Sequence, residues 1–171
     1  SAAITGACLS FVAGCSSSGG KSSGTSDLAW ALISGVDDLY AQQVGGKPVG
    51  AQDQTADCPF GGTSHVTGTT DVPSDGSQHV DLSYELTDCR IGPINSTGEL
   101  HADLTLSGTL STKGFFADPT VELVYASDEL AMHGTTSHGG SEVQVAESCE
   151  VHINRQSSTV NAILCGENVS W

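Results

Sequence analysis

Positive charge is scarce in this chain, which has 5 Lys and Arg residues against 20 Asp and Glu residues and a net charge of −15 at pH 7. Nucleic-acid binding needs basic side chains that neutralise phosphates, so this composition excludes nucleic acids as partners. The same deficit argues against attachment to anionic membranes through charge. We expect a soluble, self-repelling surface in a salty exterior.

The chain also lacks long apolar runs and the closely spaced cysteine pairs of metal-binding and redox motifs. No segment approaches the roughly 20 apolar residues that span a bilayer. None of the six cysteines forms a Cys-x-x-Cys motif, so zinc-ribbon and thioredoxin interpretations have no basis. Hydrophobic residues make up 37% and charged residues 15% of the chain, with Ser, Thr and Gly taking their place. This profile is typical of a single extracytoplasmic β-rich domain.

The most informative motif lies near the N-terminus, at Val12-Ala13-Gly14-Cys15. It follows an uncharged apolar stretch (residues 2–12) and precedes a Ser/Gly-rich segment (residues 16–20). This arrangement resembles the lipobox of bacterial lipoproteins. The resemblance implies that Cys15 is acylated and becomes the first mature residue, while residues 1–14 are removed. It further implies a membrane partner through that lipid, and a location at the outer membrane or cell surface.

An alternative keeps residues 1–14 in the working protein. The apolar segment is then a strand or helix, buried in a core or donated to a neighbouring subunit. In particular, Ile4 to Val12 has the character of a strand that adds to a neighbour's open sheet edge. Cys8 and Cys15 would then form a third disulfide.

We predict three segments: a signal-like segment (residues 1–14), a tether (residues 15–25) and one disulfide-stapled β-rich domain (residues 26–171). A helix is expected from Thr25 or Ser26, as the capping residue, to Val44. Its apolar residues form one broad stripe, with Asp37 and Asp38 on the opposite side.

From about Cys58 onward, apolar residues alternate with polar ones, as in residues 80–87, 99–106 and 143–153. Glu147 is the one exception on the apolar face of the last run. Such alternation favours an antiparallel sheet with one wet face. The predicted class is α+β, mainly β, with one N-terminal amphipathic helix packed on a curved meander of about six or seven strands. A repeated apolar-x-Gly-Thr pattern at Gly68, Gly108 and Gly134 predicts the curvature.

Cysteine usage supports export. With Cys8 discarded and Cys15 lipidated, an even set of four remains: Cys58, Cys89, Cys149 and Cys165. An even number suits disulfides in an oxidising compartment. Of the three connectivities, we prefer Cys58–Cys89 and Cys149–Cys165, because each pair brackets neighbouring predicted strands.

No catalytic constellation stands out, so we predict a protein that is not an enzyme and has no cofactor. Glu99, His101 and Asp103 lie on one polar strand face and are weak candidates for a metal site. They leave a metal-dependent hydrolase as the least favoured function.

Two other functions are preferred. The first is a non-enzymatic envelope lipoprotein that acts as a binding or scaffold module for an apolar ligand or a protein. The second is a subunit of a self-assembling filament or surface layer that uses its retained apolar N-terminus for subunit contacts.

Overall fold

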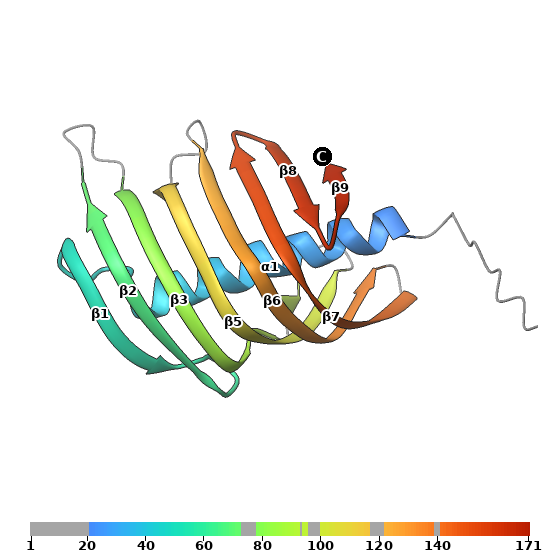
Figure 1. Cartoon of the computed structure of the whole chain (residues 1–171), viewed down its shortest axis with the longest axis horizontal. Coiled ribbons are helices and arrows are strands. Elements are labelled where there is room, and N and C mark those ends of the chain that lie inside the picture. Colours follow the sequence, from blue (N-terminus) through green and yellow to red (C-terminus); the bar gives the residue numbers. More distant parts are fainter. Residues whose placement is uncertain (1–20, 73–77, 93, 96–99, 117–121, 139–140) are drawn as a thin grey trace, which may run out of the picture.

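One long helix, α1 (Lys21–Gln43), crosses one face of an antiparallel sheet in the computed structural model of the chain (Figure 1). The structure describes residues 21–72, 78–92, 94–95, 100–116, 122–138 and 141–171. The strands in these ranges are β1 (Gly50–Asp57), β2 (Thr63–Asp71), β3 (Gln78–Arg90), β4 (Ile94–Asn95), β5 (His101–Phe116), β6 (Leu123–His138), β7 (Ser141–Gln156), β8 (Thr159–Leu164) and β9 (Glu167–Ser170). All but β4 follow one another across the sheet in chain order, and β4 pairs with β5.

The core lies between the helix and the sheet face that it crosses. Alternate residues of the central strands face this core, as the period-two pattern predicts. Leu82, Tyr84, Leu104 and Tyr125 are all at most 1% exposed, and they join Leu32 of α1 in a single hydrophobic cluster. Because each large apolar side chain contributes about 1.5–3 kcal/mol when fully buried, this cluster is the main force that holds the helix on the sheet.

Two of the repeated glycines lie where adjacent strands come very close. Gly68 and Gly134 have φ values of 129° and 142°. A Cβ atom at Gly68 would lie 2.1 Å from the backbone oxygen of Asp81, and one at Gly134 would lie 2.0 Å from that of Asp103. Glycine is therefore required at both positions by the neighbouring backbone and by the left-handed φ.

The predicted count of six or seven strands is wrong, because the described residues form nine strands of one sheet, eight of them in consecutive order. The strands at the two sides of the sheet explain the error. β1 contains no apolar residue larger than alanine, and β9 contains only Val169. Strands this polar give almost no alternating hydrophobic signal.

The predicted amphipathic helix is also wrong. The helix begins at Lys21, inside the segment expected to be a tether, so Thr25 and Ser26 belong to its first turns and do not cap it. Buried residues are not confined to one stripe, and in the described helix positions exposure is limited to Trp30, Asp38, Ala41 and Gln42. Asp37, expected on the solvent side, faces the sheet. In the described part of the chain, α1 is not apolar enough along its length to cross a membrane.

Candidate functional site

The clearest concave feature is a groove between the first turns of α1 and the side of the sheet formed by β6 to β9. Its volume is about 320 Å³, at the lower end of the range for small-ligand sites. We call it the α1–β7 groove. It is lined by Gly24, Thr25, Leu28, Thr136, Val143, Gln144, Val145, Glu147, Leu164, Cys165 and Glu167.

The groove exists because β8 is much shorter than β7. β8 pairs with Val151–Gln156, whereas Ser141–Cys149 pairs with β6 alone among the described residues. We call Ser141–Cys149 the unpaired half of β7, because it has no described strand on the side away from β6. Figure 1 shows this first half of β7 running past the end of β8 without a strand on its outer side. The groove therefore lies between three walls: the concave face of β7 beyond the end of β8, the helix, and the β8–β9 turn.

Two bonds fix the walls of the groove. The Cys149–Cys165 disulfide joins β7 to the β8–β9 turn at the point where β8 ends. On the other wall, the hydroxyl of Thr25 donates a hydrogen bond of 2.7 Å to Oε2 of Glu167. The first turns of the helix are thus tied to the start of β9, and the groove is held open by covalent and polar contacts that do not depend on a ligand.

The groove has an apolar floor and an acidic rim. Leu28, Val145 and Leu164 are buried, while Val143 keeps 48% of its surface exposed. Glu147 adds a carboxylate on the same face of β7. The lining includes no histidine, and its one cysteine is held in a disulfide. These groups suit the binding of an apolar or mixed apolar and basic ligand more than acid–base or nucleophilic chemistry.

A polar cluster farther along α1 anchors the helix. Tyr125 of β6 donates a hydrogen bond of 2.7 Å to Oδ1 of Asp37, and Nη1 of Arg155 lies 2.8 Å from Oδ2 of the same carboxylate. Burial, and secondly the negative charge of Asp37, raise the pKa of Tyr125 well above its ordinary value. The phenol therefore stays protonated and acts as a donor. The Asp37–Tyr125–Arg155 cluster positions the helix on the sheet.

The structure describes two of the three candidate metal residues. Glu99 lies outside the described residues, and His101 is at the start of β5. Asp103 forms a two-point ion pair with Arg90, including a 2.7 Å hydrogen bond from Nε to Oδ1. This guanidinium holds the pKa of Asp103 below its usual range. Within the described part of the chain, no group of three His, Cys, Asp or Glu side chains has metal-binding geometry.

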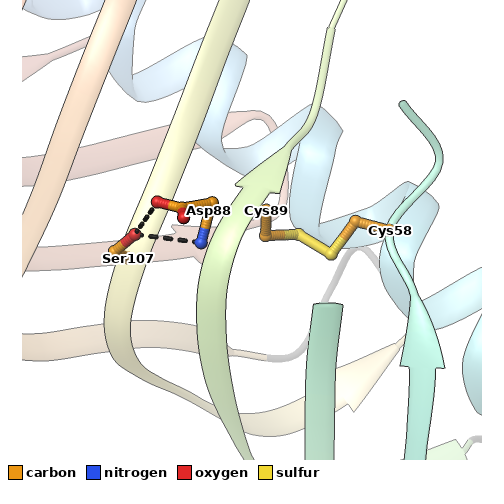
Figure 2. The surroundings of a disulfide bond; sticks show 4 residues. All are labelled: Cys58, Asp88, Cys89 and Ser107. Carbon is orange, nitrogen blue, oxygen red and sulfur yellow. Dashed lines mark hydrogen bonds between the residues drawn. A yellow bond between two sulfur atoms is a disulfide. The ribbon is translucent and has the colours of Figure 1, made fainter. Parts of the chain in front are cut away.

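The cysteine candidates have different outcomes. The structure contains both preferred disulfides, Cys58–Cys89 and Cys149–Cys165. Cys8 and the proposed lipidation residue Cys15 lie outside the described residues. Figure 2 shows the first disulfide beside a bulge in β3, where Asp88 adopts a φ of 47°. There the backbone N–H of Asp88 donates to the Ser107 hydroxyl at 3.0 Å, which supports the bulged backbone.

The outer face of the sheet carries cations that pair with its carboxylates. Lys113 forms a 2.8 Å ion pair with Asp81, and Arg90 pairs with Asp103. His65 lies between Asp53 and Glu85, at 2.9 Å and 3.5 Å. Hydrogen bonds that the imidazole donates to Asp53 and, secondly, to Glu85 raise the pKa of His65. The acidic outer face is thus partly neutralised from within the chain.

Sequence reasoning missed the groove, although one signal for it was visible. Glu147 breaks the apolar pattern of its strand, and this residue lies on the groove side of the unpaired half of β7. The signal is weak without the structure, because only the short pairing of β8 shows that this part of β7 is an edge. Comparisons with protein-family models, curated proteins and solved structures found no match.

Proposed function

We propose that this protein is a non-enzymatic, extracytoplasmic lipoprotein that serves as a binding module of the cell envelope. The lipid on Cys15 would hold it at the membrane, and the α1–β7 groove would hold its ligand. Cys15 is close in sequence to Lys21, where α1 begins, so the anchor and the groove belong to the same end of the helix.

The observation that carries this proposal is the groove beside the unpaired half of β7. It combines apolar floor residues, such as Val143 and Leu164, with the carboxylate of Glu147. Its walls are fixed by a disulfide and a side-chain hydrogen bond, so little ordering is needed when a ligand binds. The two disulfides also suit an oxidising compartment, which supports export.

Mass spectrometry of the N-terminal peptide from native material tests the anchor. A diacyl or triacyl mass on Cys15, with nothing upstream, is the expected result. A Cys15→Ala variant should lose this mass and leave the membrane fraction, while both disulfides remain. If the native peptide carries residues 1–14 and an unmodified Cys15, the lipoprotein proposal is wrong.

One observation favours the second candidate function, a subunit of an extracellular assembly. The outer edge of Ser141–Cys149 has no strand partner among the described residues, and a retained apolar segment such as Ile4 to Val12 is the kind of chain that adds to an open edge. This function predicts concentration-dependent oligomers that disappear when residues 1–14 are deleted. A monomer at all concentrations with residues 1–14 present would exclude it.

A further inference from the structure

The unpaired half of β7 is a well-formed site for an added strand. Ser141–Cys149 is held in register by β6, from His138↔Ser141 to Leu130↔Cys149. The backbone N–H of Cys165 donates to the backbone oxygen of Glu150 at 3.1 Å, so the carbonyl of Glu150 points in the plane of the sheet away from β6. Because these groups alternate along a strand, the backbone groups of Glu142, Gln144, Ala146 and Ser148 point outward too.

This edge lacks several of the usual features that protect a strand against pairing. Natural edge strands are commonly short, bulged or marked by lysine, proline or an inward-pointing charge. The unpaired half of β7 contains neither lysine nor proline, its register with β6 is continuous from Ser141 to Cys149, and Glu147 is its one charge on the groove side. At the opposite edge, β1, the side chain of Gln52 donates to the backbone oxygen of Pro48 at 3.0 Å, and the side chain of Gln54 contacts both Lys47 and the end of α1.

Side-chain chemistry indicates which strand would fit. The side chains of Val143, Val145 and Glu147 lie on the groove face of the sheet, while those of Glu142 and Ala146 lie on the opposite, solvent-facing face. A strand placed alongside β7 would direct alternate side chains into the groove, near Leu28 and Leu164. Those side chains should be apolar, to match the floor. The others would face solvent beside Glu142 and Glu150.

Charge selects against a second copy of this chain. Antiparallel pairing of two such edges would bring the carboxylates of Glu142, Glu147 and Glu150 near those of the copy, and like charges on paired strands are destabilising. Each copy also carries a net charge of −15. No Lys or Arg lies in the unpaired half of β7 to offset this repulsion. The complementary partner is therefore basic.

We infer that the unpaired half of β7 binds an extended segment of a partner protein in which apolar residues alternate with Lys or Arg, added to the sheet as a further strand. This inference rests on the proposed function, since it names the ligand class of the same groove. Main-chain hydrogen bonds to β7 would hold the segment, the groove would accept its apolar side chains, and the glutamates would select its charge.

Labelled peptides and full-length, disulfide-bonded protein test the inference by fluorescence polarisation. The probe is a capped peptide of four Lys-Val repeats, and the matched control is the same peptide with Glu in place of Lys. We expect saturable binding of the Lys-Val peptide and none of the Glu-Val peptide. Glu142→Gln, on the face that meets the Lys side chains, should weaken binding about two- to fivefold and reduce its salt dependence.

Backbone pairing is tested on both partners. Ala146→Pro removes one outward N–H without removing a bond to β6, and it should weaken binding about tenfold. Ala146→Val keeps the N–H and should change binding less than twofold. On the peptide, methylation of the backbone nitrogens of all Lys residues blocks the N–H groups along one edge, and methylation of those of all Val residues blocks the other edge. One of these two peptides should therefore lose binding.

Each outcome decides a different point. Strand addition would be overturned if both N-methylated peptides bound as tightly as the unmethylated one and if Ala146→Pro bound the Lys-Val peptide as tightly as the unsubstituted protein. If a peptide of residues 1–14 binds more tightly than the Lys-Val peptide, the strand that pairs with β7 is this chain's own N-terminus, and the inference of a basic partner is wrong. If no peptide binds, this inference fails, whereas the mass on Cys15 decides separately whether the protein is a lipoprotein.

Discussion

Replacing Tyr125 with phenylalanine removes one hydroxyl from the Asp37–Tyr125–Arg155 cluster and should destabilise the fold by about 1.5 kcal/mol. Hydrogen bonds to charged partners contribute about 1.5–3 kcal/mol. We place this bond at the low end because the Asp37 side chain is 32% exposed, so water can replace the lost phenol, and Arg155 still contacts the carboxylate. For a chain of this length the melting temperature should fall by about 3–6 °C.

Tyr40→Phe is the matched control. Tyr40 is also a buried tyrosine, and it stacks on Phe116 with ring centroids 3.8 Å apart. Its buried hydroxyl has no hydrogen-bond partner in the described part of the chain. The substitution keeps the stacking and removes an unsatisfied group, so stability should be unchanged or slightly higher.

Urea unfolding at pH 7 of the proteins with both disulfides intact measures both changes. The dependence of the unfolding free energy on urea concentration must be the same in all the proteins for the comparison to hold. If Tyr125→Phe and Tyr40→Phe shift the midpoint equally, the hydrogen bond to Asp37 contributes nothing specific and the assignment of an anchoring cluster is wrong.

Two further predictions concern the helix contact and the outer face. Gly35→Ala should destabilise the protein by about 1–3 kcal/mol, because a Cβ there would lie 2.4 Å from Cδ1 of Ile91, whereas Gly24→Ala, with open space at its Cβ, should be neutral or stabilising by urea unfolding. His65 should titrate above its ordinary pKa by NMR, so that its stabilising contribution is complete in acid and is lost as the pH rises through the raised pKa. Asp53→Asn should lower that pKa, and an unchanged titration curve would contradict the contact.

The sequence predicted the parts of the fold that depend on local periodicity. The alternation around Leu82 and Tyr84, and around Leu104, placed these residues on the buried face of antiparallel strands, and the structure confirms it. Cysteine spacing pointed to the correct pairs because each pair brackets neighbouring strands. These signals are local, since a strand's inner face follows from its own residues.

The errors arose where tertiary contacts override local pattern. Asp37 has the position of a solvent-facing helix residue, yet Tyr125 and Arg155 give it two partners at the sheet. Likewise, Thr25 has the sequence character of a cap, but its hydroxyl bonds to Glu167 at the far end of the chain. Neither partner can be identified from the helix sequence, because each comes from a strand more than eighty residues away.

The groove results from unequal strand lengths, a property of neighbouring strands together. β7 has 16 residues and β8 has 6, so the pairing of one strand stops while the other continues. The Cys149–Cys165 disulfide lies at this boundary and joins the last paired part of the sheet to the unpaired part. Because β6 pairs with this half of β7 from Ser141 to Cys149, the edge remains an ordered strand without a second neighbour among the described residues. This edge is acidic and lies beside an apolar groove, and these two properties support the proposal that it binds a basic strand from another protein and not a copy of this chain.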